Sequence, residues 1–125
     1  MTVPMKSQKC ILIVDDDADV LLFLEDRLNA LGYDVLTAGN GQEGLDVLQR
    51  QSVNGVLLDL DMPVMGGITM LEKLGSCPTF PPVIVMSAND HLAELQQAVI
   101  KGAMDFFIKP ISQNALTSKC LRLFQ

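Results

Sequence analysis

The sequence predicts an α/β fold in which helices cover both faces of a doubly wound, five-stranded parallel sheet. Short apolar runs alternate five times with segments in which apolar residues recur at helical intervals. The runs are apolar throughout rather than at every second position, which is typical of strands buried on both faces. Glycines stand where two of the helices should end. Together these observations predict a parallel sheet between two layers of helices, five in all.

The predicted strands are the five apolar runs. The first, third and fourth, CILIV, GVLL and PVIVM, have no polar residue in their interior. The second and fifth, DVL and MDFFI, each include one aspartate. In chain order the predicted strands span residues 10–14, 34–36, 55–58, 82–86 and 104–108.

The predicted helices lie between these runs and after the last one. Gly32 follows the first helix and Gly102 the fourth, each at the position where a left-handed residue commonly ends a helix. Asp17 directly precedes the first helix and is predicted to cap it. The apolar positions that predict the helices are, in order, Val20, Leu24, Leu28 and Leu31; Leu45 and Leu48; Met70, Leu71 and Leu74; Leu92, Leu95 and Val99; and Leu116, Cys120 and Leu123.

Composition limits the classes of function. With 125 residues, 49% of them hydrophobic, the chain is of the size for one domain with one core. A net charge of −6 argues against binding nucleic acid or an anionic membrane through this domain, because phosphate groups require clustered Lys and Arg. Cys10, Cys77 and Cys120 have neither disulfide nor zinc-site spacing. We expect a cytoplasmic protein with a loose N-terminal tail at residues 1–9 and a single domain over residues 10–125.

Polar residues gather where four of the predicted strands end. In open parallel sheets, ligands bind beyond the carboxyl ends of the strands. Like charges about 4 Å apart repel by about 1 kcal/mol even in water, so neighbouring carboxylates at such an edge call for a cation. Oxygen ligands suit Mg²⁺, and a carboxylate nucleophile beside a cation, an ammonium and a hydroxyl can accept a phosphoryl group. The residues are Asp15, Asp16 and Asp17 after the first strand, Asp59 and Asp61 after the third, Ser87 after the fourth and Lys109 after the fifth.

Four motifs resemble the receiver domain of bacterial two-component response regulators. They are ILIVDDD, LLDLDMPVMGG, VIVMSA and DFFIKP, and they match in order and spacing over the chain from about Cys10 onward. The resemblance implies a flavodoxin-like sheet with strand order 2-1-3-4-5. The chain departs from the pattern at Met65-Gly66-Gly67, where many receivers have Met-Asp-Gly. We expect this change to make the loop more flexible without abolishing phosphorylation.

The resemblance also assigns roles to the residues at the strand ends. Asp59 would accept a phosphoryl group from a histidine kinase or phosphotransfer protein, and the domain would catalyse only its own phosphorylation and slow dephosphorylation. The bond between Lys109 and Pro110 would be cis, turning the lysine into the site. Mg²⁺ would be bound by Asp15, Asp16, Asp59 and the backbone carbonyl of Asp61; Ser87 and Lys109 would bind phosphoryl oxygens; and Ser87 and Phe106 would form the conformational switch.

An output surface is expected on the helix at about residues 90–101, the last strand and the final helix. Ile100, Leu121 and Phe124 fall outside the core stripes of their helices, which predicts an apolar face there. An effector domain or protein, or a second copy of the domain, would bind this face. Because the final helix ends without a capping glycine or a polar tail, we expect the chain to be part of a longer regulator.

Several of these residues have simpler interpretations that the sequence leaves open. The simpler alternative for Ser87 is to satisfy a helix N-terminus, although the site role is favoured, and Phe106 is equally a core residue. The Asp61 side chain is expected to face solvent and to act on the site only through its charge. His91, the single histidine, is expected at the surface at the start of a helix.

Three other functions fit part of the pattern. Haloacid-dehalogenase-type phosphatases also have an Asp-x-Asp motif after a strand, usually with Thr or Val two places beyond the second Asp, where this chain has Pro63. In addition, the acid pair Asp15 and Asp16 lies upstream of the motif rather than downstream, and the chain has no room for a cap domain. A flavodoxin-like electron carrier shares the predicted fold, yet three aspartates after the first strand would repel its phosphate. The third alternative is an interaction module that keeps the fold but is never phosphorylated.

Overall fold

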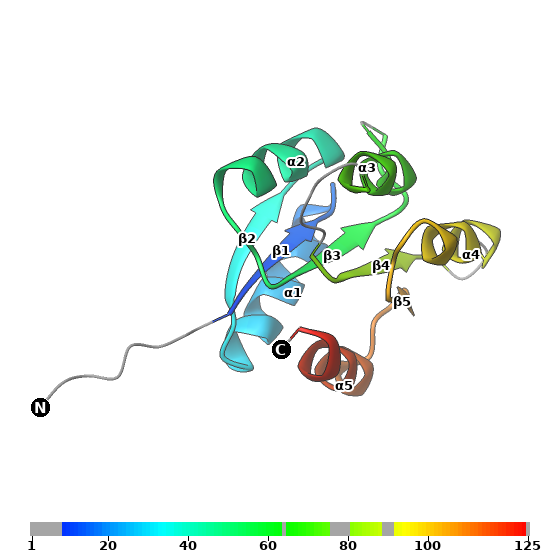
Figure 1. Cartoon of the computed structure of the whole chain (residues 1–125). Helices are drawn as coiled ribbons and strands as arrows, with labels where there is room; N and C mark the ends of the chain where they lie inside the picture. Colours follow the sequence, from blue (N-terminus) through cyan, green and yellow to red (C-terminus); the bar gives the residue numbers. More distant parts are fainter. Residues whose placement is uncertain (1–8, 64, 76–80, 89–91, 125) are drawn as a thin grey trace, which may run out of the picture.

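The computed structural model describes residues 9–63, 65–75, 81–88 and 92–124, and within them five parallel strands alternate with five helices (Figure 1). The sheet has the order β2-β1-β3-β4-β5, which confirms the predicted fold class and strand order. In chain order the elements are β1 (Cys10–Val14), α1 (Ala18–Ala30), β2 (Asp34–Ala38), α2 (Gly41–Arg50), β3 (Gly55–Asp59), α3 (Gly67–Leu74), β4 (Val83–Ser87), α4 (Leu92–Ile100), β5 (Asp105–Ile108) and α5 (Gln113–Leu123).

The strands differ from the prediction by one or two residues at their ends. Strand β2 continues through Thr37 and Ala38, which pair with Ile13 and Val14 of β1 although Thr37 is polar. Strand β4 runs from Val83 to Ser87, one residue later than predicted, because Ser87 pairs with Ile108 of β5. Pairing with a neighbouring strand, rather than apolar character, therefore decides where these strands end.

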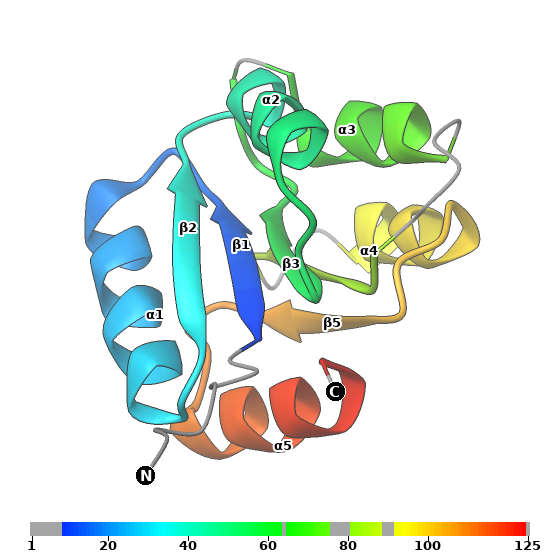
Figure 2. The ribbon, with the colours of Figure 1, turned by 60° about the vertical axis from the view of Figure 1, so that its left-hand side comes forward.

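Helices cover the two faces of the sheet in separate layers. Helices α1 and α5 lie on one face, and α2, α3 and α4 lie on the other (Figures 1 and 2). Alternate residues of a strand enter the two cores: Leu12 and Val14 of β1 pack in the cluster beneath α2–α4, and Ile11 and Ile13 pack in the cluster beneath α1 and α5. All four side chains are fully buried, which explains why the run is continuously apolar.

The predicted helix ends are confirmed. Gly32 has φ +96° and Gly102 has φ +118°, the left-handed conformation that glycine adopts without steric cost. At the start of α1, the Asp17 side chain accepts hydrogen bonds from the backbone N–H groups of Asp19 and Val20. None of the helices in the described residues is both long and apolar enough to cross a bilayer.

Phe124 lies in the core and not on an exposed face, so the prediction for this residue is wrong. Helix α5 ends at Leu123, and the chain then turns so that the Phe124 ring lies where a side chain at Gly55 would otherwise stand. The Tyr33 hydroxyl contacts the carbonyl oxygens of Cys120 and Phe124 at 3.1 and 3.4 Å and holds this end of α5 in place. Helical spacing misplaces Phe124 because the helix no longer continues there.

Candidate functional site

The predicted polar residues meet at the carboxyl edge of the sheet. Asp59 and Ser87 are the last residues of β3 and β4, while Asp15 and Lys109 follow β1 and β5 directly. The registers Val14↔Leu58, Asp59↔Met86 and Ser87↔Ile108 bring these strand ends level with one another. Backbone hydrogen bonds continue the pairing beyond the strands, from Leu60 N to Met86 O at 2.9 Å and from Lys109 N to Ser87 O at 2.8 Å.

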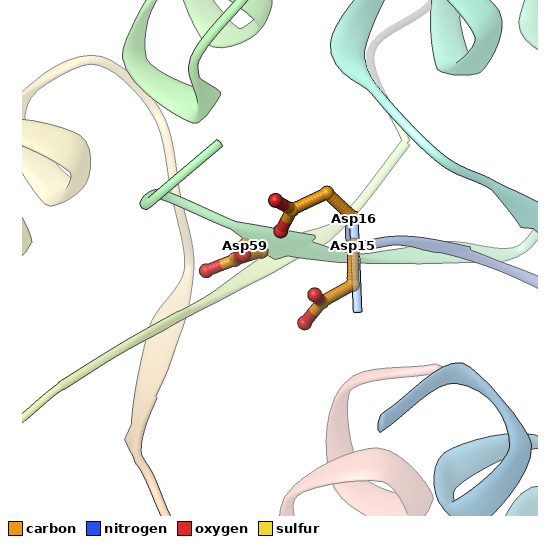
Figure 3. Close-up of side chains that lie close together, drawn as sticks. All are labelled: Asp15, Asp16 and Asp59. Atoms are coloured by element: carbon orange, nitrogen blue, oxygen red, sulfur yellow. The ribbon is translucent and has the colours of Figure 1, made fainter. Parts of the chain in front are cut away.

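Three carboxylates converge at this edge. Asp15, Asp16 and Asp59 each offer an oxygen, and the three oxygens lie within 4.8 Å of one another. Figure 3 shows the side chains of Asp15 and Asp16 turned to the side on which Asp59 lies. Asp15 and Asp59 are buried, whereas Asp16 is exposed. Such a set of hard oxygen donors, open to water on one side, suits a small divalent cation.

Lys109 contributes a fixed positive charge between the two buried carboxylates. Its Nζ lies 3.1 Å from Asp15 Oδ2 and 3.2 Å from Asp59 Oδ1. Burial acts to lower the pKa of Lys109, but the charges of Asp59 and Asp15 and their hydrogen bonds outweigh it, so the pKa is raised. The bond between Lys109 and Pro110 is cis, as predicted.

Asp59 is the carboxyl group whose pKa is shifted most strongly among the described residues. Burial raises its pKa to about 6, and the neighbouring Asp15 carboxylate adds to the increase. The Asp61 backbone N–H, which donates to Asp59 Oδ1 at 3.1 Å, and the Lys109 ammonium limit the increase. The Asp59 carboxylate is therefore costly to ionise within the protein alone, and a nearby cation would favour its anionic, nucleophilic form.

Ser87 is fully buried, and its hydroxyl contacts Asp61. Ser87 Oγ lies 3.1 Å from Asp61 Oδ2 and 3.3 Å from Oδ1, and the Ala88 N–H donates to Oδ2 at 3.4 Å. The expectation that Asp61 acts only through its charge is wrong: the residue is exposed, but its carboxylate accepts hydrogen bonds from the end of β4. The sequence contained no sign of this contact, which joins residues 26 positions apart.

Phe106 is partly buried on β5 and packs against the core beneath α2–α4. Lys119 of α5 donates a hydrogen bond to the Phe106 carbonyl at 2.6 Å, and its ammonium lies 5.1 Å from the centre of the Phe106 ring.

Asp105 pairs with Lys119 at 3.0 Å and with Arg122 at 2.9 Å. Burial acts to raise the pKa of Asp105, but hydrogen bonds from the Phe106 N–H and Lys119 and the charges of Lys119 and Arg122 outweigh it, so the pKa is lowered. This cluster was missed because no local spacing connects β5 with α5.

Two of the residues considered in the sequence analysis, His91 and Cys77, lie outside the described residues. The predicted tail at residues 1–9 also lies outside them except for Lys9.

The sheet has the order 2-1-3-4-5 and brings an acid triad, a lysine and a serine to its carboxyl edge, which is the arrangement expected of a receiver domain. The sequence model of the response regulator receiver domain matches residues 11–121. The chain belongs to this family, which confirms the resemblance seen in the sequence.

The chain is similar in sequence to transcriptional regulators. The chain is 34% identical over 115 residues to a probable transcriptional regulator, ycf27, of Porphyridium aerugineum, covering 92% of this chain and 47% of the relative. It is 37% identical over 106 residues to the transcriptional regulatory protein GlrR of Escherichia coli, covering 85% of this chain and 24% of the relative. The chain thus spans about half or less of the length of these relatives.

Solved structures share the fold along nearly the whole chain. A putative response regulator from Chloroflexus aurantiacus superposes with a TM-score of 0.90 at 25% identity, covering 94% of this chain and 98% of that one. A CheY-like receiver domain protein from Methanospirillum hungatei superposes with a TM-score of 0.86 at 30% identity, covering 93% of each chain.

Proposed function

We propose that this receiver domain accepts a phosphoryl group on Asp59 from a phosphohistidine of a histidine kinase or phosphotransfer protein. The observation that carries the proposal is the position of the Asp59 carboxylate, which lies within reach of two further acids and 3.2 Å from the Lys109 ammonium. Of the three acids, only Asp59 belongs to a strand, and that strand, β3, lies at the centre of the sheet between β1 and β4.

Asp15, Asp16 and Asp59 fit a Mg²⁺ ion by the chemistry of their donor atoms. All three offer carboxylate oxygens, and the exposure of Asp16 leaves one side open to water and to a phosphoryl group. We assign the backbone carbonyl of Asp61 as a further ligand. When bound, Mg²⁺ supplies positive charge that offsets the negative charge of the carboxylates and of the phosphoryl oxygens.

Asp59, Lys109 and Ser87 have separate roles in the proposed phosphoryl transfer. An Asp59 oxygen attacks phosphorus, the P–O bond forms as the P–N bond of phosphohistidine breaks, and the released imidazole nitrogen takes up a proton. Lys109 pairs with the phosphoryl oxygens, and the Ser87 hydroxyl donates to them. Because the domain is itself the acceptor, it acts on itself and does not turn over an external substrate.

The phosphoryl group adds nearly two negative charges at the site, and we propose that α4, β5 and α5 carry the response to a partner. The described part of this surface presents Ile100 at the end of α4, Met104 just before β5 and Leu121 of α5, whose exposed fractions are 84%, 57% and 49%. Phe106 lies on β5 between these helices. An effector domain or a second copy is the proposed partner. We place the domain in the cytoplasm, in keeping with the free thiols of Cys10 and Cys120.

Incubation with acetyl phosphate and Mg²⁺ tests the assignment of Asp59. Intact-mass measurement is expected to show the gain of one phosphoryl group in the wild type and none in Asp59→Asn. Asp26→Asn, which changes an exposed acid on α1, serves as the control and should react like the wild type. If Asp59→Asn gains the same mass, the acceptor is another residue. If the wild type gains none, the domain is an interaction module that is not phosphorylated.

A further inference from the structure

The contact between Asp61 and Ser87 has a consequence for the switch. Ser87 Oγ lies within hydrogen-bonding distance of both Asp61 carboxylate oxygens, and the Ala88 N–H donates to one of them. The Ser87 side chain is fully buried, while Asp61 is exposed and is placed over it from the loop that follows β3. The end of β4 is thus attached to the loop that follows the phosphoacceptor.

Asp61 connects the acceptor to the serine. Its backbone N–H donates to Asp59 Oδ1 at 3.1 Å, and its side chain accepts from Ser87 Oγ at 3.1 Å. The two contacts therefore join one residue both to the carboxylate that is to be phosphorylated and to the hydroxyl that is to respond. A change at Asp59 can reach Ser87 directly through this residue.

A serine hydroxyl carries one proton and donates one full hydrogen bond at a time. The Asp61 carboxylate and the oxygens of a phosphoryl group on Asp59 therefore compete for the same donor. We propose that Asp61 is a positioning residue that holds Ser87 in its unphosphorylated arrangement and sets how readily the switch responds. This inference rests on the proposed function, because it takes Asp59 as the phosphoryl acceptor.

Removing the Asp61 carboxylate should take away this competing acceptor for the Ser87 hydroxyl and strengthen binding of a phosphoryl mimic. A hydrogen bond to a charged group contributes enough that its loss shifts such an equilibrium by on the order of tenfold. Asp61→Asn retains an acceptor oxygen but loses the charge, so a smaller increase in affinity is expected for it. The effect of either substitution should depend on the presence of the Ser87 hydroxyl.

A double-mutant cycle measures this dependence. Beryllofluoride affinity is measured at saturating Mg²⁺ for the wild type, Asp61→Ala, Ser87→Ala and the double variant, with binding followed by amide NMR shifts. We expect Asp61→Ala to bind about tenfold more tightly than the wild type, and the double variant to bind no more tightly than Ser87→Ala. Asp26→Ala, which removes the same charge from an exposed position on α1, should leave the affinity unchanged.

Two results would overturn the inference. If Asp61→Ala strengthens binding equally with and without the Ser87 hydroxyl, Asp61 acts by charge repulsion alone and does not hold the serine. If neither Asp61→Ala nor Asp61→Asn changes the affinity, the contact has no influence on the switch. In both cases the wild type still binds beryllofluoride, whereas a wild type that fails to bind it with Mg²⁺ would refute the proposed function and this inference with it.

Discussion

Replacing Asp59 with asparagine is expected to stabilise the unphosphorylated domain at pH 7 when divalent cations are removed by a chelator. The Asp59 side chain is almost completely buried, and burial raises its pKa from 3.8 to about 6. At pH 7 the folded protein therefore carries an ionised carboxylate that the unfolded chain bears at lower cost. Asparagine has nearly the same shape and no charge, so it removes this cost.

The magnitude follows from the two pKa values. The difference between about 6 and 3.8, at about 1.4 kcal/mol for each pH unit, corresponds to about 3 kcal/mol at pH 7. We expect a net gain of about 2 kcal/mol in the free energy of unfolding, because the amide must still be buried and Lys109 loses one of its two acid partners.

The pH dependence of the free energy of unfolding tests the sign of the Asp59 contribution independently. As the pH falls from about 7 toward 4, the folded state takes up a proton at Asp59 before the unfolded state does, so this group makes the wild type more stable with decreasing pH. Asp59→Asn should lack that component. Urea denaturation of both proteins between pH 4 and 8, with a chelator present, measures the difference.

Asp105→Asn is the matched control, because the pKa of Asp105 is lowered by its partners. Asp105 contributes stability that is present above its unfolded pKa and is lost as the pH falls through its folded pKa, so this substitution should destabilise the domain at pH 7. The explanation from burial is refuted if Asp59→Asn is no more stable than the wild type at pH 7 and shows the same pH dependence.

Three further predictions concern the metal, the lysine and the core. Asp16→Ala should abolish Mg²⁺ binding, measured by calorimetry, with the circular dichroism spectrum unchanged because the side chain is exposed; an unchanged affinity would remove Asp16 from the ligand set. Lys109→Met should block phosphorylation by acetyl phosphate and lower stability at neutral pH, since Asp15 loses its cation; full phosphorylation would contradict the role of the lysine. Gly55→Ala should lower the free energy of unfolding by about 2 kcal/mol or more, because its methyl group would overlap the Phe124 ring, and an unchanged urea midpoint would contradict the packing.

Most of the fold was predictable because its determinants are local in the chain. Continuous burial on both faces requires an uninterrupted apolar run, which is why Ile11 to Val14 could be recognised as a strand. A helix that ends at a residue with left-handed backbone conformation favours glycine there, and the free N–H groups at the start of a helix favour a side chain that accepts hydrogen bonds. Gly32 and Asp17 therefore also indicated their own structure. The candidate site followed from the same logic, because parallel strands bring their carboxyl ends to one edge and residues after them must meet.

The sequence by itself thus determined the fold class, the strand order implied by the family and the residues that gather around Asp59. Only the tertiary structure decided the contacts between elements: the Asp61 carboxylate on the Ser87 hydroxyl, Lys119 on the Phe106 carbonyl, and the Phe124 ring over Gly55. In each case the partners are distant in sequence, and their meeting depends on how a loop turns or where a helix stops. Hydrophobic periodicity records which face of an element is buried, but it carries no information about which polar group or ring on another element lies opposite.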